Sequence, residues 1–338
     1  MTDATKPSSE RAFLDRYFGL SESGSDVRTE FIAGITTFLT MVYIVFVNPQ
    51  ILGNAGMDKG AVFVATCIAA AVSTLVMALY ANYPIALAPG MALNYRNVIG
   101  ATLIGILAAT LIGLPLGLAE FTGIVSAPPS LAPTFLQLDF SRVAELTFII
   151  IVFSFLMVDV FDNAGTLIGV AHRAGLLDAD GNLPRMKQAL LADSFAAMFG
   201  ALIGTSTTTS YIESAAGVSA GGRTGLTAVF VALFFLLALF FAPLAGMIPA
   251  YASAAALLYV ACVMTRGLAE IDWEDITEYA PAVVAAVTMP LTYSIATGIG
   301  LGFITYALAK LIAGKFDEVK PAVVILAVIF AIKFALPG

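Results

Sequence analysis

Charged residues are scarce in this chain of 338 residues. Asp, Glu, Lys and Arg make up 12% of it, and hydrophobic residues make up 59%. Soluble globular domains carry about 25% charged residues, so the shortage excludes a water-soluble domain. The sixteen basic residues form no patch of the kind that binds nucleic acid. The formal net charge of -7 says little about partners, because membrane topology depends on where Lys and Arg lie.

Cysteine is also rare, and the chain shows no metal-binding pattern. Cys67 and Cys262 both lie in apolar runs, with no CxxC motif and no His/Cys cluster nearby. We therefore expect them to pack as small hydrophobic residues, and we expect no metal and no cofactor. The first thirty residues lack the short apolar core and cleavage site of a signal peptide, so residues 1–30 are predicted to be a cytoplasmic tail.

Long apolar runs recur from Phe31 to the end of the chain, and each can cross a hydrocarbon layer of roughly 30 Å as a helix. The runs are solid rather than alternating, which favours an all-α polytopic membrane protein over a β-barrel. The predicted spans lie near residues 31–48, 61–80, 98–119, 147–171, 188–204, 225–246, 250–267, 279–293, 295–313 and 321–336.

The basic residues predict which loops face the cytoplasm. They gather in the N-terminal tail and in two later segments, and the proline-containing loop 120–146 carries a single Arg. Positive loops stay on the cytoplasmic side, so we expect the tail inside and loop 120–146 outside, in an inner or plasma cell membrane. The basic residues of the two later segments are Arg173, Arg185 and Lys187, and Lys310, Lys315 and Lys320.

Two stretches at predicted membrane depth do not resemble helix. Residues 83–94 contain two prolines and a glycine, and residues 205–213 are rich in hydroxyl and β-branched side chains that favour extended chain. Each follows two predicted helices, so residues 31–94 and 147–213 are interpreted as two copies of one unit. Paired, interrupted hydrophobic segments are typical of transporters built from repeats, with the substrate site between the broken pieces.

Two carboxylic acids lie inside one predicted span. Asp159 and Asp162, with Asn163 and Thr166, have the spacing i, i+3, i+4 and i+7 and share one helix face. A buried charge costs about 2.5 to 3.5 kcal/mol on insertion scales, and no Lys or Arg lies in a span centre to neutralise these acids. Cation or proton coupling is the leading interpretation; a helix-packing interface held by hydrogen bonds is the alternative.

Glu213 ends the second broken segment, and Asn94 occupies the matching place in the first. The spacing from Ser210 to Glu213 also fits a capping box at the start of a helix. The two interpretations are compatible, because a helix that begins in mid-membrane offers N–H groups to a ligand. His172 is interpreted as interfacial, and Asp193 as an acid that suits the dipole near the start of its helix.

Three strings resemble the adenine/guanine/hypoxanthine branch of the xanthine/uracil permease family. They are ALAPGMALN (86–94), VDVFDNAGTLIGVAHRAGLLDADGNLPRM (158–186) and GTSTTTSYIESAAGVSAGGRTGL (204–226). The resemblance covers nearly the whole chain. It implies a fold of seven plus seven inverted-repeat spans, divided into core and gate domains, that moves nucleobases with protons. It also implies that Asn94, Asp159, Asp162 and Glu213 match the family's substrate-site positions.

The chain departs from the family after Asn94. Tyr95-Arg96-Asn97 leads directly into the span that aligns with the family's seventh. Roughly a hundred residues are absent, about four spans at twenty residues each, so the first repeat is predicted to be truncated. An even number of missing crossings keeps later segments in their original orientation. The predicted divisions are 1–30 tail, 31–97 first-repeat core, 98–146 gate-type span and external loop, 147–224 second-repeat core, and 225–338 remaining core and gate spans.

The expected function is proton symport of purine nucleobases by alternating access. Asn94, Asp162 and Glu213 are expected to bind the base and Asp159 to carry the proton. The supporting residues are Asn163, Thr166 and Ser210. The preferred purine is left open, as is whether a homodimer forms within the lipid bilayer.

Three alternatives to this function differ in how well the residues fit them. The first is a product of internal deletion that keeps the motifs and cannot transport. The second, an anion carrier of the same fold, is weaker because three acids without a basic partner suit anions poorly. The third, an intramembrane aspartyl protease, fails because Asp159 and Asp162 share one helix and no GxGD motif occurs, so no enzyme is expected.

Overall fold

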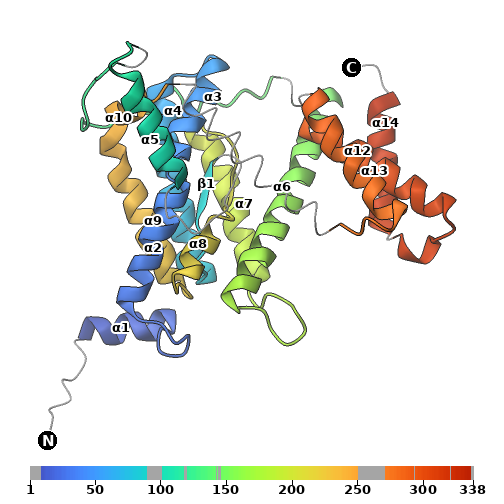
Figure 1. Ribbon diagram of the computed structural model, residues 1–338, viewed down its shortest axis with the longest axis horizontal. Coiled ribbons are helices and arrows are strands. Elements are labelled where there is room, and N and C mark those ends of the chain that lie inside the picture. The colour runs from blue at the N-terminus through green and yellow to red at the C-terminus, as the bar shows by residue number, and fades with distance from the viewer. Residues whose placement is uncertain are drawn as a thin grey trace, which may run out of the picture. The chain divides into compact units, whose positions relative to one another are not determined.

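The computed structural model describes residues 9–89, 101–117, 120–141, 143, 146–249, 271–292, 294–319 and 321–335 (Figure 1). By the clustering of its contacts the chain divides into two compact units. The first unit is Met1–Leu138 with Asn163–Val263, and the second is Asp139–Asp162 with Met264–Gly338. Both are built from helices, and the two short strands of the described residues lie in the first unit.

The first unit begins with α1 (Ser9–Phe18), α2 (Val27–Met41), α3 (Ile44–Asn54) and α4 (Lys59–Val76), and α4 continues into a π-helical turn, η1 (Met77–Ala81). Aspartates start two of these helices: Asp26 accepts a hydrogen bond from the Thr29 amide, and Asp58 accepts one from Ala61. These carboxylates satisfy amide groups that a helix start leaves without partners.

The remaining elements of the first unit, together with the helix that enters it from the second, follow in chain order. They are β1 (Leu87–Pro89), α5 (Ala101–Gly113), α6 (Leu146–Ala174), α7 (Met186–Ile203), β2 (Thr208–Ser210), α8 (Ser214–Ser219), α9 (Gly225–Ala238), the 3₁₀ turn η2 (Leu239–Phe241) and α10 (Ala242–Met247). The division between the units falls within α6, after Asp162. Two successions of helix, helix and strand therefore occur, α2/α3–α4–β1 and α6–α7–β2, at the places where the sequence predicts two copies of one unit.

Four helical stretches in the described part of the chain are long and apolar enough to cross a membrane. They are Val27–Asn54, Lys59–Ala81, Met186–Ile203 and Gly225–Met247. All four lie in the first unit, and each matches one of the predicted spans. The predicted span at 250–267 and the residues 90–100, which include Asn94 and Arg96, lie outside the described residues.

Hydrogen bonds between loops mark two ends of the first unit. We call the end near the N-terminal tail the tail end, and the end near the predicted external loop the loop end. At the tail end, the Asn82 side chain donates to the Phe18 carbonyl and accepts from the Gly225 amide, and the Arg185 amide donates to the Tyr83 hydroxyl. At the loop end, residues of the predicted external loop meet the last turn of α7 and the turn η2 that follows α9. The bonds run from Thr134 to the Ile203 carbonyl and from the Ser126 amide to the Phe240 carbonyl.

These two ends lie at opposite ends of α7, because Arg185 immediately precedes that helix and Ile203 is its last residue. The N-terminal tail and the basic loop 173–187 therefore share one end, and the loop residues 126–134 lie at the other, as the predicted topology requires. Which side of the membrane each end faces stays a prediction.

Glu30 on α2 is fully buried and holds the start of α9. Its carboxylate accepts hydrogen bonds from the amides of Arg223 and Thr227, at 3.1 Å each, and from the Thr227 hydroxyl. A carboxylate suits a helix start, because amide hydrogens and the positive end of the helix dipole point toward it. The close contact continues along α2, where a Cβ on Gly217 of α8 would overlap the Thr37 hydroxyl.

The described part of the second unit includes α12 (Ile276–Thr292), α13 (Ile295–Ile312), the 3₁₀ turn η4 (Phe316–Glu318) and α14 (Pro321–Ala335). Glycines allow α12 and α13 to approach closely, because a Cβ on Gly298 would lie 2.2 Å from the side chain of Met289 and 2.9 Å from the Ala285 carbonyl. Small residues at such positions let helix backbones pack together in a membrane.

Charged side chains fasten the open end of the α12–α13 hairpin. The Lys310 ammonium is 1% exposed and lies 2.6 Å from Glu278 and 2.5 Å from Glu318. Lys315 pairs with Asp275, which lies just before α12. The Lys315 hydrogen bond, helped by Thr277, holds the pKa of Asp275 well below its usual range. This pair therefore contributes stability at neutral pH and loses it only as the pH falls below the ordinary range of a carboxyl group.

We predict that Glu30→Gln lowers the unfolding temperature of the purified protein in detergent. The amide keeps the volume of the carboxyl and loses the charge that several donors share, which costs about 2 kcal/mol. Glu22→Gln is the matched control, because Glu22 is exposed near the same tail. Equal unfolding temperatures for the two variants would contradict the role given to Glu30.

Candidate functional site

The two broken segments of the sequence form one antiparallel strand pair. Leu87 lies opposite Ser210, Ala88 opposite Thr209, and Pro89 opposite Thr208. The pair lies between α4 and α7 (Figure 1), and all six of its residues are buried. Asp193, which contacts β2, is the eighth residue of α7, so the strands lie near the middle of that helix rather than at either end.

Side chains of neighbouring elements supply the hydrogen bonds that β1 cannot make within itself. The Thr74 hydroxyl, on α4, accepts from the Leu87 amide at 2.9 Å and lies 3.0 Å from its carbonyl. The Ala86 amide donates to the Ser214 hydroxyl, and the Ala86 carbonyl accepts from the Tyr211 amide. Extended backbone in a membrane protein is stable only when protein groups replace water in this way.

Strand β2 is held in the same way by α6 and α7. The Asn163 side-chain oxygen accepts from the Ser210 amide and from the Thr209 hydroxyl, at 2.9 Å each. The Ser210 hydroxyl points to Asp193, with 3.4 Å between the oxygens. Asn163 and Ser210, which the sequence analysis expects to support the site, therefore position the strand itself.

Glu213 lies just beyond β2 at the start of α8, and none of its surface is exposed. The Tyr43 hydroxyl, from the turn between α2 and α3, donates to its carboxylate at 3.0 Å. Burying a carboxylate is costly unless donors surround it. Glu213 is thus an acid held in the interior, beside extended backbone and close to the middle of the unit.

Two buried hydroxyl groups near the strand pair form no hydrogen bond within the described residues. They belong to Ser73, which adjoins Thr74 on α4, and to Thr208 in β2. A buried hydroxyl without a partner costs free energy, so each is available to a water molecule or a ligand. Thr166, another predicted supporting residue, is buried one turn after Asn163 on α6.

The predicted capping box at Ser210 and Glu213 is wrong. Ser210 lies in β2, and Glu213 is itself the residue before α8, with no side-chain cap bond. Instead of forming a capping box, Glu213 accepts a hydrogen bond from Tyr43, and Ser210 pairs with Leu87 in the strand pair. The interpretation of Asp193 as an acid that suits the helix dipole also changes, because this residue lies two turns into α7 and contacts Ser210.

Two of the predicted site residues, Asp159 and Asp162, belong to the second unit. On α6, Asp159 is half-buried and Asp162 is exposed. The continuous helix confirms that they share a face with Asn163 and Thr166. Asn94 lies outside the described residues, so its role stays a prediction.

Sequence reasoning missed three residues that organise the site, namely Tyr43, Thr74 and Asp193. Tyr43 and Thr74 lie far along the chain from Glu213, and neither breaks the apolar pattern of its helix. Asp193 carried a usable signal, since an acid well inside a predicted span demands a partner. Within the described residues, no group of three His, Cys, Asp or Glu side chains is placed to hold a metal ion.

Comparisons with known proteins identify the family. The profile of the xanthine/uracil permeases, described as a permease family, matches residues 28–101 and 96–301. The adenine permease AdeP of Escherichia coli is 40% identical over an alignment 433 positions long, gaps included, which covers 97% of each chain. The guanine/hypoxanthine permease PbuO of Bacillus subtilis is 35% identical over 428, covering 94% of this chain and 99% of PbuO. The chain belongs to the xanthine/uracil permease family, whose members are membrane transporters and not enzymes.

We predict that Asn163→Leu destabilises the purified protein. The variant has a similar volume and leaves the Ser210 amide without its acceptor, a loss of about 1 to 3 kcal/mol for a buried group. Thermal unfolding in detergent measures the effect, and Asn182→Leu, at an exposed loop position, is the control. If the two variants unfold at the same temperature, Asn163 does not hold β2.

Proposed function

We propose that this permease carries purine nucleobases, and that it moves them together with protons by alternating access. The observation that carries the proposal is the fully buried Glu213, held by Tyr43 beside the paired strands. The relatives named adenine permease and guanine/hypoxanthine permease support the choice of substrate class. The coupling ion and the transport cycle are expectations that rest on the family.

A buried carboxylate suits a purine, because every purine base presents N–H groups along its edge. Glu213 accepts hydrogen bonds from these groups, and the Tyr43 hydroxyl keeps the carboxylate in one orientation. Asp162 and Asn94 supply the remaining polar contacts in this proposal. A site that hydrogen-bonds its substrate rejects analogues without the matching group strongly, because its own buried groups would otherwise lose their partners.

Asp159 is proposed to carry the proton. It lies one helical turn before Asn163 on α6 and is half-buried, and a carboxyl group can bind and release a proton. The division of roles between Asp159 and Asp162 belongs to the proposal.

An inverted-repeat fold with core and gate domains is part of the same proposal. Its support is the repeated order of helix, helix and strand, and the antiparallel pairing of β1 with β2. Two copies related by a two-fold axis in the membrane plane would present their broken segments to each other in this antiparallel way.

The second candidate function is a product of internal deletion that cannot transport. The family profile matches the chain in two pieces that meet at residues 96–101, where the sequence predicts missing spans. The alignments with the relatives also extend over 428 to 433 positions, gaps included, although this chain has 338 residues. A permease without part of its gate would bind its substrate and fail to alternate between the two sides of the membrane.

We predict saturable uptake of radiolabelled adenine, guanine or hypoxanthine by cells that lack their own purine permeases and express this chain. Uptake should be faster at the lower of two external pH values. Glu213→Gln should reduce it about tenfold or more, since hydrogen bonds to a charged group are lost. Glu120→Gln, at an exposed position of the external loop, is the control.

The variant Asp159→Asn tests the coupling of uptake to protons in the same assay. Asp159→Asn should abolish the pH dependence, because an amide cannot load a proton. Proton-driven uptake that persists in Asp159→Asn would remove this residue from the proton path. No uptake by the unmodified chain, despite its insertion in the membrane, would favour the internally deleted product.

We also predict that Tyr43→Phe raises the KM for purine uptake about three- to tenfold. The ring keeps its place in the core, and the carboxylate loses one donor. Tyr17→Phe is the matched control, because it removes a tyrosine hydroxyl bond at the tail end, to the Leu79 carbonyl. An unchanged KM in Tyr43→Phe would mean that Tyr43 does not orient Glu213 for substrate.

A further inference from the structure

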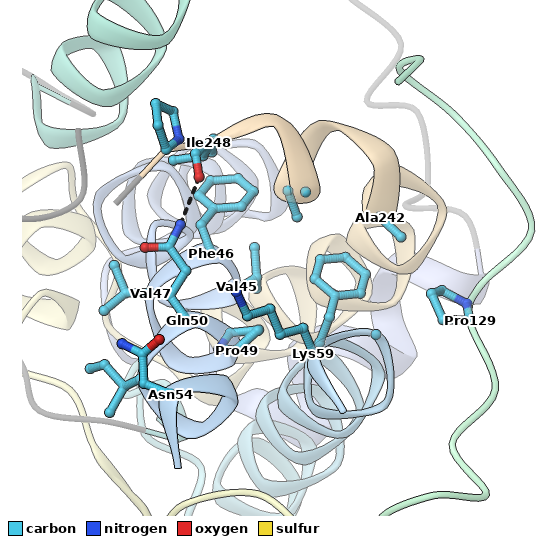
Figure 2. A pocket seen from close by; sticks show the side chains of 16 residues that line it. Val45, Phe46, Val47, Pro49, Gln50, Asn54, Lys59, Pro129, Ala242 and Ile248 are labelled. Carbon is cyan, nitrogen blue, oxygen red and sulfur yellow. Dashed lines mark hydrogen bonds between the residues drawn. The ribbon is translucent and has the colours of Figure 1, made fainter. Parts of the chain in front are cut away.

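A pocket of about 490 Å³ opens at the loop end of the first unit, away from the strand pair (Figure 2). Its walls come from α3, from the first turns of α4, from Pro129 of the external loop, and from α10 with the residues that follow it. The volume lies within the range of about 300 to 1,000 Å³ that is typical of small-molecule sites.

The pocket lies at the boundary of the membrane. It is lined by the last turns of one candidate span, Val27–Asn54, and by the beginning of the next, Lys59–Ala81. Only four residues connect these two spans, so the turn between them marks the depth at which the chain leaves the hydrocarbon layer. Lipid phosphates lie at this depth.

The lining changes from polar to apolar along α3. Asn54 and Lys59 lie at the helix ends, and Val45 and Phe46 lie nine and eight residues before Asn54, about 12 to 14 Å away along the axis. Phe63 of α4 adds a second aromatic side chain to the lining. An elongated pocket with one charged end and one apolar end fits an elongated ligand that has a charged group at one end and an apolar chain at the other.

Lys59 is the one charged residue among those that line the pocket, and Asp58, whose carboxylate caps the start of α4, adjoins it in the chain. Lys59 is exposed and forms no ion pair within the described residues. Its methylene groups lie against Gly53, where a Cβ would come within 2.5 Å of them. Figure 2 shows the side chain extended across the pocket toward α3, and no acidic residue is among those that line it.

One hydrogen bond fastens the wall, and a proline in α3 leaves one backbone carbonyl of the wall without its helical partner. The Gln50 side chain donates to the Ile248 carbonyl at 2.7 Å and so joins α3 to the segment after α10. Pro49 lies inside α3 and has no amide hydrogen, so the Val45 carbonyl at the deep end has no partner four residues later. The pocket is therefore a built part of the unit rather than a gap between mobile side chains.

We propose that this pocket binds one anionic phospholipid, with the phosphate at Lys59 and part of an acyl chain along Val45, Phe46 and Phe63. A lone lysine favours an anion, and an exposed ion pair contributes up to about fivefold to binding. A neutral purine has no need of the charge and lacks the length of the pocket. The site is separate from Glu213 and does not depend on the proposed transport function.

Native mass spectrometry of the purified, delipidated chain tests the proposal with three probes. Phosphatidylglycerol should bind at one molecule per chain, diacylglycerol with the same acyl chains about fivefold more weakly, and inorganic phosphate alone not detectably. Lys59→Met keeps the length of the stem and should reduce phosphatidylglycerol binding about fivefold without affecting diacylglycerol. Lys59→Arg should restore it.

A second variant tests the apolar part of the pocket. Gly246 lines the pocket, and a Cβ there meets no atom within 4 Å, so Gly246→Leu should fill the space and weaken both lipids. Gly169→Leu adds the same side chain on α6, where a Cβ also meets nothing, and should leave binding unchanged. Equal binding of phosphatidylglycerol to the unmodified chain, Lys59→Met and Gly246→Leu would overturn the proposal, as would displacement of the lipid by adenine.

Discussion

The structure depends on one requirement, that extended backbone in the interior of a membrane protein must find all of its hydrogen bonds within the protein. Residues 87–89 and 208–210 are extended, buried and far apart in sequence. They satisfy part of the requirement by pairing with each other. Thr74, Asn163 and Ser214 satisfy the rest, because each bonds directly to the backbone of β1, of the residue before it, or of β2.

This requirement separates the polar residues into two groups. Asn163 and Ser210 bond within the strand pair and its supports, so they position the site. Glu213 lies at the end of the pair, where the chain turns into α8, and Tyr43 reaches it from the turn between α2 and α3. We assign substrate binding to this acid because it is fully buried beside the extended backbone. The pocket near Lys59 lies at the loop end. In our proposal it binds a membrane lipid rather than the transported substrate.

Periodicity and helix breakers predicted the parts of this fold that local chemistry controls. Pro84, Pro89 and the hydroxyl-rich run at 205–210 predicted the two extended segments, and the spacing of Asp159, Asp162, Asn163 and Thr166 predicted one helix face. The pairing register and the contacts of Tyr43, Thr74 and Asp193 were out of reach, because they join residues that are distant in sequence. The predicted capping box failed for the same reason, since Ser210 pairs with β1 instead of capping a helix.

Binding of a purine to the purified chain tests the central claim most directly, because it does not require a complete gate. Equilibrium binding of radiolabelled adenine, guanine and hypoxanthine should be saturable, with one site per chain, and Glu213→Gln should weaken it at least tenfold. That result would hold for a transporting permease and for an internally deleted one. No purine binding by a well-folded chain, or equal binding by Glu213→Gln, would contradict the assignment of the site.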